Sequence, residues 1–456
     1  MKQSRDYIFH EATMSLCSVC SKNVPAKLLI ENNHIYIQKS CNEHGIHTEL
    51  LEEDADYHLS KRKFDKSGTF THPDTSIAHG CPNDCGLCPD HDQHTCIGLI
   101  EITNRCNLQC PVCFANSGND QSLSVATINK MLDFYVDAED GDAEILQISG
   151  GEPTIHPNII EILELALSKH IRYVMLNTNG IRIATDIDFV KQLSKFNSRF
   201  EVYLQFDGFK ETTYQHLRGT NILDLKLQAI TNLLNHEIPV TLVSSIVQGV
   251  NDDEIGEIIK FGMEKKGIRG INFQPIAFFG RNNTQVALNR TTLSGIIRQI
   301  ELQASDIFTK GDIIPLPCNV ERVAIAYLIK GKKGKFIPLA RKVEINSYLP
   351  IVENTFAFDA DRVIDSTIEH IKNEMQLCDC FKLLNDIREF FPKSYLIKNE
   401  ADKREFINEN TFRISVTSFI DKYNFDLKSM QKECVHILTP DNKRIPFSAY
   451  NMFHRK

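Results

Sequence analysis

The chain has 456 residues, 42% of them hydrophobic and 24% charged, a globular composition that excludes disordered, collagen-like and coiled-coil chains. Its formal net charge of −8 weighs against a general nucleic-acid binder, because such proteins are usually basic. Its apolar runs fall well short of the roughly 20 residues of a transmembrane helix, and residues 1–12 lack the apolar core of a secretory signal. We therefore expect a cytoplasmic protein of several domains.

The first 60 residues carry a predicted metal site. The pairs Cys17-x2-Cys20 and Cys41-x2-His44 are separated by 20 residues. In a reducing compartment such short spacings favour metal ligation over disulfides. We expect a small domain over 1–60 that holds zinc, or a single iron in rubredoxin style, and that depends on the metal to fold.

Residues 97–280 alternate predicted strands with predicted helices. The strands are expected at 97–103, 143–149, 172–178, 200–206, 240–247 and 269–275. The helices are expected at 122–137, 158–167, 186–195, 225–234 and 253–265. This alternation predicts an α/β fold, a partial (β/α)6 barrel of the TIM type, with a doubly wound open sheet as the alternative. In either fold, the chemistry lies at the carboxyl ends of the strands.

Two C-x3-C-x2-C motifs follow one another in the sequence. The first, in the segment 61–96, consists of Cys81, Cys85 and Cys88, and Cys96 eight residues later can complete a four-ligand auxiliary iron–sulfur cluster. The second consists of Cys106, Cys110 and Cys113, and it follows the first predicted barrel strand with no cysteine nearby to complete it. Three thiolates on a 4Fe–4S cube leave one iron open to a small molecule, whereas a zinc site needs a fourth ligand that the local sequence does not offer. We therefore assign the catalytic, open cluster to the second motif.

Residues 281–456 have an irregular pattern and are expected to form an appended region for substrate or a further cluster. Four more cysteines lie in this region, at Cys318, Cys378, Cys380 and Cys434. They suffice for a third cluster, or they are free structural thiols. The region also contains the basic run KGKKGK (330–335).

The sequence CNLQCPVC (106–113) resembles the signature of the radical S-adenosylmethionine (SAM) superfamily, and the Gly-Gly-Glu-Pro sequence at 150–153 reinforces the likeness. In that superfamily the Gly-Gly-Glu-Pro motif receives the amino-acid end of SAM. The resemblance implies that Gly150 and Gly151 let the backbone approach the ligand and that the Glu152 carboxylate holds the ammonium group. It also implies that side chains at the next strand ends contact SAM, namely Asn177, Asn179, Gln205 and Asp207, with Gln274 on the adenosine side.

The resemblance further implies the chemistry. One electron from a donor such as flavodoxin or ferredoxin cleaves SAM into methionine and a 5′-deoxyadenosyl radical, which abstracts hydrogen from a substrate carbon. The order of domains, the segment 79–96 and the sequence HILTPDNKRIPFSAYN (436–451) resemble the branch that contains tetraether lipid synthases and pterin dimethyltransferase-like enzymes. A cysteine is usual in that branch where Ser448 stands here, so Cys378 or Cys380 is a candidate to compensate.

The leading hypothesis is therefore an enzyme that forms a carbon–carbon bond at an sp3 carbon, by lipid chain coupling or by C-methylation. The alternative within this class is a C-methyltransferase acting on a pterin-like heterocycle. Other classes are a multi-cluster electron carrier or scaffold, and a metal-stabilised binding module. We expect an apolar or partly apolar substrate at the barrel mouth and a peripheral membrane contact through residues 330–335.

Overall fold

The computed structural model describes residues 5–455 except 70–71, 119–120, 197–198, 282–289, 332–333 and 342–397. Cys378 and Cys380 lie outside the described residues. Within the described ranges, none of the helices has the length and apolar character needed to cross a bilayer.

The N-terminal residues form a four-stranded antiparallel sheet. Its strands are β1 (Ile8–Leu16), β2 (Asn23–Glu31), β3 (His34–Cys41) and β4 (Gly45–Glu52), in sheet order β1-β2-β3-β4. The turn between β2 and β3 consists of Asn32 and Asn33, which both adopt positive φ, as a two-residue hairpin requires. The short helices α1 (Ala55–Ser60) and η1 (Lys61–Lys63) follow.

The second sheet has eight consecutive parallel strands at its centre. Their order is β15-β5-β6-β7-β8-β9-β10-β14. The strands are β5 (Ile97–Glu101), β6 (Ala143–Ser149), β7 (Ile171–Thr178), β8 (Phe200–Gln205), β9 (Val240–Ile246), β10 (Ile268–Pro275), β14 (Thr411–Thr417) and β15 (Val435–Thr439). The six predicted strands are thus present in chain order, and no order reversal of the kind that defines a doubly wound sheet occurs among them. Among the described residues no pairing joins the two ends of this sheet.

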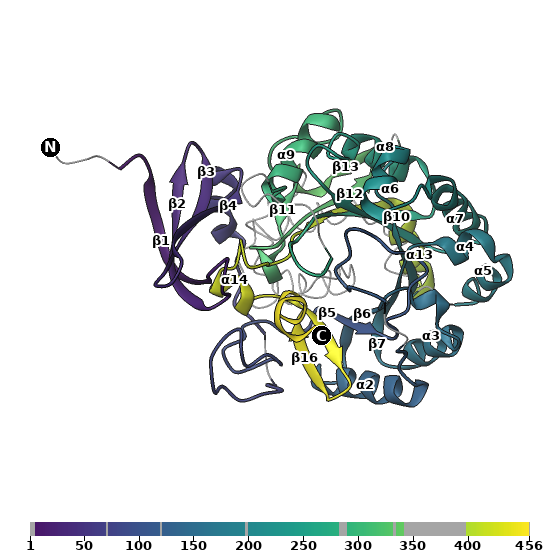
Figure 1. Ribbon diagram of the computed structural model, residues 1–456. Coiled ribbons are helices and arrows are strands. Elements are labelled where there is room, and N and C mark those ends of the chain that lie inside the picture. Colours follow the sequence, from purple (N-terminus) through teal and green to yellow (C-terminus); the bar gives the residue numbers. More distant parts are fainter. Residues whose placement is uncertain are drawn as a thin grey trace, which may run out of the picture.

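Figure 1 shows the helices lying along the outer side of the curved sheet. They are α2 (Val125–Ala138), α3 (Ile159–Ser168), α4 (Ile181–Thr185), α5 (Ile187–Leu193), α6 (Glu211–Arg218), α7 (Leu223–Asn235), α8 (Ile255–Glu264) and α9 (Leu293–Gln303). Ser124 caps α2 by accepting from Thr127 N at 3.1 Å, so this helix begins three residues later than the expected 122. The hydrophobic core between helices and sheet includes Ile128, Leu146 and Leu163, all fully buried.

The C-terminal region belongs to the same sheet and is not an irregular appendage. Strand β14 extends the parallel series beyond β10, and β15 extends it on the other side of β5. The flanking strands pair antiparallel and are β11 (Ile314–Pro315), β12 (Val323–Lys330), β13 (Phe336–Pro338) and β16 (Lys443–Pro446). The remaining short elements are η2 (Pro153–Ile155), η3 (Pro317–Asn319), η4 (Leu339–Arg341), α13 (Glu400–Asn410), α14 (Leu427–Gln431), α15 (Phe447–Ala449) and η6 (Tyr450–His454).

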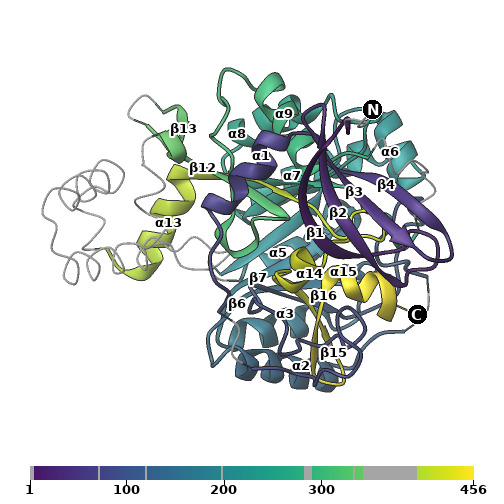
Figure 2. The ribbon, with the colours of Figure 1, turned by 90° about the vertical axis from the view of Figure 1, so that its left-hand side faces the viewer.

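The N-terminal sheet packs against the C-terminal segment. Figure 2 shows β1 to β4 beside α14. Ser15 Oγ donates to the carbonyl oxygen of Phe425 at 2.6 Å, and the buried Lys39 donates to the carbonyl oxygen of Lys422 at the same distance. Glu52 accepts from the backbone N–H and the hydroxyl of Ser294 at the start of α9. The N-terminal domain is therefore fixed to the barrel by buried polar contacts.

Candidate functional site

The loop after β5 brings Cys106, Cys110 and Cys113 to one cavity of about 250 Å³ at the carboxyl ends of the strands. Burial by itself would raise the pKa of the Cys113 thiol, but the backbone N–H of Ser117 and the side chain of Arg281 lower it overall. Burial raises the pKa of Cys106, whose sulfur accepts from Leu108 N at 3.4 Å. Three thiols on one loop, with an open cavity beside them, fit a cluster that leaves one iron accessible to a ligand.

The two glycines after β6 allow close contact with this cysteine loop. Gly151 N donates to Thr103 O at 2.7 Å, and Glu152 N donates to Arg105 O at 2.8 Å. A Cβ on Gly150 would lie 2.2 Å from the oxygen of Thr103, and one on Gly151 would lie 2.1 Å from that of Arg105. The glycines are therefore required where the backbone meets the cysteine loop, whereas the sequence analysis attributed them to the approach of a ligand.

The Glu152 carboxylate, 1% exposed, is occupied by donors of the protein itself. It accepts from the backbone N–H and the hydroxyl of Thr154, from the hydroxyl of Thr178 at 2.7 Å and from Asn179 N at 2.7 Å. Asn179 in turn donates to Asn107 Oδ1 in the cysteine loop at 2.7 Å. Glu152 thus joins the ends of β6 and β7 and, through Asn179, fixes the loop. Its direct contact with SAM remains a prediction.

We expect Glu152→Gln to weaken SAM binding through this network. The substituted amide would point donor hydrogens at N–H and O–H groups, so at least one buried hydrogen bond would be lost. A loss of about 1.5–3 kcal/mol corresponds to roughly ten- to a hundredfold in the SAM dissociation constant. Equilibrium binding to the cluster-loaded enzyme measures it, with the exposed Glu161→Gln on α3 as the matched control. An unchanged dissociation constant would contradict the assignment.

A buried ion pair lies beside the cysteine loop. Arg218 donates to both oxygens of Asp207 at 2.7 and 2.8 Å, and both side chains are at most 4% exposed. In the orientation that satisfies its neighbours, the Gln205 oxygen accepts from Arg218 at 2.8 and 2.9 Å. Gln205 and Arg218 line the cavity, whereas Asp207 does not, and both oxygens of its carboxylate accept from Arg218. Any effect of Asp207 on SAM binding would therefore be indirect, through the position of Arg218.

Two cationic residues of this network were missed by the sequence analysis. Arg218 ends α6, and Lys226, fully buried on α7, donates to the carbonyl oxygen of Asn179 at 2.6 Å. Burial lowers the pKa of Lys226 to about 7. Neither residue belongs to a recognisable motif, because a Lys or Arg on an amphipathic helix is normally exposed. The sequence therefore contains no signal for them.

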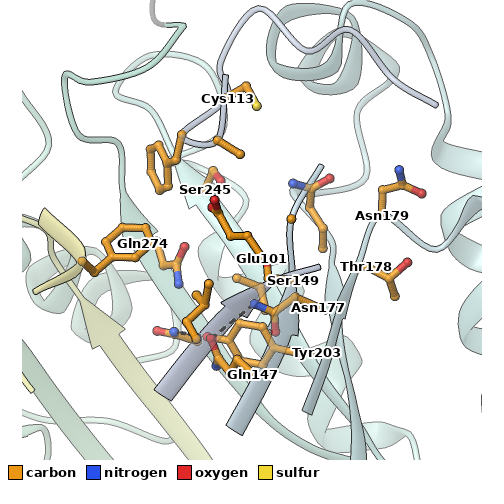
Figure 3. Close-up of a pocket in the computed structure, with 18 of the residues that line it drawn as sticks. Glu101, Cys113, Gln147, Ser149, Asn177, Thr178, Asn179, Tyr203, Ser245 and Gln274 are labelled. Atoms are coloured by element: carbon orange, nitrogen blue, oxygen red, sulfur yellow. Dashed lines mark hydrogen bonds between the residues drawn. The ribbon is translucent and has the colours of Figure 1, made fainter. Parts of the chain in front are cut away.

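Asn177 lies deeper in the cavity than Asn179. Its Nδ2 donates to Gln147 Oε1 on β6 at 3.2 Å. Figure 3 shows Asn177, Gln147 and Tyr203 together at one end of the cavity, with Cys113 at the other. Asn177 and Asn179 both line the cavity, and the contact of each with SAM stays a prediction.

The predicted N-terminal metal site is assembled in the structure. The ligand atoms of Cys17, Cys20, Cys41 and His44 all lie within 4.8 Å of one another. His44 Nδ1 is 3.7 Å from Cys17 Sγ and 3.5 Å from Cys41 Sγ. Burial by itself would raise the pKa of Cys17, but the backbone N–H groups of Cys20 and Val19 lower it to about 6, which favours the thiolate that a metal needs. This donor set fits a closed, structural site.

We expect Cys20→Ser to unfold the N-terminal domain. Metal binding in such small domains supplies about 10–16 kcal/mol of apparent folding energy, far more than a 60-residue segment gains from its core. Limited proteolysis and metal analysis measure the effect, with Ser40→Ala, an exposed neighbour of Cys41, as the control. Equal protease resistance of the variant and the wild-type chain would contradict it.

Cys96 lies in a different group from the one the spacing suggested. Its sulfur lies within 4.8 Å of those of Cys318 and Cys434, and all three residues are at most 2% exposed. The structure therefore places Cys96 beside Cys318 and Cys434, and its membership of the expected set with Cys81, Cys85 and Cys88 stays a prediction. Cys96 precedes β5, Cys434 precedes β15, and these strands are paired, so the sheet brings the two thiols together. His94 Nε2 lies 3.7 Å from Cys96 Sγ and 3.2 Å from Glu144 Oε1, which adds a nitrogen ligand within reach.

The remaining motif, Cys81, Cys85 and Cys88, lines a separate small cavity beside Met430 and Pro446. Burial raises the pKa of Cys81 to about 12 and also raises that of Cys85. Ser448 donates to Glu433 Oε1 at 2.6 Å, and both residues are buried. The residue that replaces the expected cysteine is thus satisfied by a buried carboxylate.

Comparison with known proteins agrees with this geometry. Residues 100–262 match the radical SAM superfamily and residues 9–53 match the HMPTM N-terminal zinc ribbon domain. The fold and the cysteine loop are those of a radical SAM enzyme, which implies a 4Fe–4S cluster and SAM as cofactors. The chain is 33% identical over 97% of its length to 7,8-dihydro-6-hydroxymethylpterin dimethyltransferase of Methanocaldococcus jannaschii, covering 94% of that enzyme. It belongs to the radical SAM family of this dimethyltransferase.

More distant similarities cover the barrel. GTP 3′,8-cyclase of Clostridium perfringens is 27% identical over 41% of the chain and 59% of the cyclase. The solved structure of Streptococcus suis SuiB bound to S-adenosylmethionine covers 47% of the chain and 48% of SuiB, at 18% identity and a TM-score of 0.38.

Proposed function

We propose that this enzyme methylates a carbon of a small pterin-like heterocycle. The observation that carries the proposal is the similarity to 7,8-dihydro-6-hydroxymethylpterin dimethyltransferase, which extends through the zinc ribbon, the barrel and the C-terminal strands alike. A likeness confined to the barrel would have supported the superfamily without a substrate class.

The chain's own residues would hold and shield the reactants. Cys106, Cys110 and Cys113 would bind the cluster. When bound, the cluster and SAM would supply a 5′-deoxyadenosyl radical that takes a hydrogen atom from a substrate carbon, and a second SAM would supply the methyl group and leave as S-adenosylhomocysteine, with one electron from the reductant for each SAM. The rings of Phe114, Phe419 and Phe447 form one wall of the cavity, with centroids 4.6–6.3 Å apart, and would exclude water from the radical.

The other cysteine groups would serve as metal centres of the same enzyme. We assign zinc to the N-terminal site and auxiliary iron–sulfur clusters to the Cys96 and Cys81 groups. The Cys96 group lies closest to the substrate, because Ile97 and Val435, the neighbours of Cys96 and Cys434, line the cavity. We also propose an external electron donor of the flavodoxin or ferredoxin type. The location that suits these centres is the reducing cytoplasm.

Lipid chain coupling is the second candidate. The apolar side chains on one side of the cavity favour it, including Leu99, Ile145 and Met175. Of the basic run at 330–335, residues 332–333 lie outside the described part of the chain, so the predicted membrane contact stays a prediction.

The test supplies the cluster-loaded enzyme with SAM, a reductant and, in parallel, 7,8-dihydro-6-hydroxymethylpterin or vesicles of phospholipid. We expect 5′-deoxyadenosine and methionine in both, and a mass gain of one methylene unit per methylation in the pterin alone. Joined lipid chains without pterin methylation would establish the second candidate. Failure to cleave SAM under any condition would overturn both.

A further inference from the structure

The cavity contains buried polar atoms whose hydrogen-bonding capacity is unused. Asn177 Oδ1, Asn272 Oδ1 and Thr417 Oγ1 line it, are buried and have no partner within the described structure. Asn272 and Thr417 are 5% and 6% exposed. Buried acceptors left without a donor cost about 1–3 kcal/mol each, so three in one cavity indicate a ligand that supplies the donors.

These atoms belong to a band of polar side chains that crosses neighbouring strands. Asn177 on β7 is in register with Tyr203 on β8, and Asn272 on β10 is in register with Ser415 on β14. Tyr203 connects the two halves, because its hydroxyl accepts from Asn272 Nδ2. Figure 3 shows Gln147, Asn177 and Tyr203 side by side, well away from Cys113. We call Gln147, Asn177, Tyr203 and Asn272 the polar floor.

The contacts of the polar floor fix the direction of its amides. Asn177 Nδ2 donates to Gln147 Oε1, and Asn272 Nδ2 donates to the Tyr203 hydroxyl. Each amide therefore leaves its oxygen as the unused acceptor, in a side chain that lines the cavity. A ligand that fits this floor carries N–H donors along one edge.

Two ion pairs lie beside the cavity, and the Arg413 guanidinium, which also lines it, donates to the Thr241 hydroxyl at 3.4 Å. Arg218 is bound to Asp207, and Glu101 accepts two hydrogen bonds from Arg455 at 2.6 and 3.0 Å. The unused acceptors of the polar floor are neutral amide oxygens. A hydrocarbon chain would leave them unpaired, which costs free energy, whereas a neutral ring with amino and ring N–H groups would satisfy them.

We propose that Asn177 and Asn272 recognise the aminopyrimidinone edge of a pterin-like substrate, accepting from its amino group and ring N–H. This inference rests on the proposed function and adds which residues determine substrate specificity and which edge of the ring they bind. The reacting carbon then lies on the opposite part of the ring, toward the cysteine loop. Tyr203 is the positioning residue that holds Asn272.

The test compares two ligands on two variants. The cluster-loaded enzyme is titrated with 7,8-dihydro-6-hydroxymethylpterin and with its 2-oxo analogue, in which oxygen replaces the amino group. The wild-type chain should prefer the amino compound by about tenfold, the equivalent of one buried hydrogen bond. Asn272→Leu and Asn177→Leu should each bind the pterin about tenfold more weakly, and the variant that lacks the acceptor of the amino group should also lose the preference between the two ligands.

Control variants separate recognition from stability. Asn272→Asp keeps an acceptor and should retain the preference, and Asn129→Leu on the exposed face of α2 should behave as wild type. If neither variant changes the ratio between the two ligands, the role of both residues is structural, which would overturn the inference while methylation by the wild-type chain upheld the proposed function. A wild-type chain that binds neither ligand would instead overturn the proposed function itself.

Discussion

Replacing Cys106, Cys110 and Cys113 together by alanine is expected to abolish SAM cleavage. All three thiols line the same cavity and leave one side open for SAM. Without them no iron is held where the glycine motif meets the loop, so neither 5′-deoxyadenosine nor methionine should form. Iron analysis should show the loss of one 4Fe–4S cluster, and product assays under reductant should show no turnover.

The matched control is the triple alanine variant of Cys81, Cys85 and Cys88. These thiols line a separate cavity, beside Met430 and Pro446. This variant should lose a comparable amount of iron and still contain the cysteine loop's cluster. Cleavage that survives in the first variant and disappears in the second would mean that the two motifs have been assigned in reverse.

The strand series was predictable because each parallel strand is a short apolar run. β6, with the sequence AEILQIS, is buried along nearly its whole length, and the same holds for β9. Such runs between helical patterns favour parallel pairing over any antiparallel arrangement. The cysteine loop was equally accessible, since a motif directly after a strand lies at its carboxyl end.

The sequence did not allow us to predict that β14 and β15 extend the sheet on either side of the six predicted strands. β14 and β15 pair with strands more than 130 and 330 residues away, as Ile271 with Ile414 and Gly98 with His436 demonstrate. Local periodicity contains no information on such distant partners. The same limit applies to Cys96, which the spacing groups with its neighbours in sequence, whereas the fold places it beside Cys318 and Cys434.

Residue roles also depended on contacts that a motif does not specify. Glu152 was expected to face the ammonium group of SAM, yet four donors from Thr154, Thr178 and Asn179 converge on its carboxylate. A carboxylate at a strand end is compatible with either role until its neighbours are known. The unpartnered oxygen of Asn272 is a similar case, because only the fold shows that it is buried and faces the cavity.

The regrouping of the cysteines has a consequence for iron content that can be measured. If Cys96, Cys318 and Cys434 hold one centre, Cys96→Ser and Cys434→Ser should each lose the same iron, and the double variant should lose no more than either. Cys96→Ser combined with Cys85→Ser should lose the sum, because the two residues then belong to different centres. Independent sites add in this way and members of one site do not.

We expect this loss to be accompanied by a large drop in stability. The three thiols are at most 2% exposed, and Cys96 and Cys434 directly precede the paired strands β5 and β15, so a shared centre would tie these two strands together. Melting curves should place Cys96→Ser and Cys434→Ser well below the wild-type chain, and Cys318→Ser with them. Should Cys96→Ser with Cys85→Ser lose no more iron than Cys85→Ser by itself, the four cysteines between 81 and 96 form one centre after all. In that case the contact of Cys96 with Cys434 is packing of free thiols, which bury well in cores without any metal.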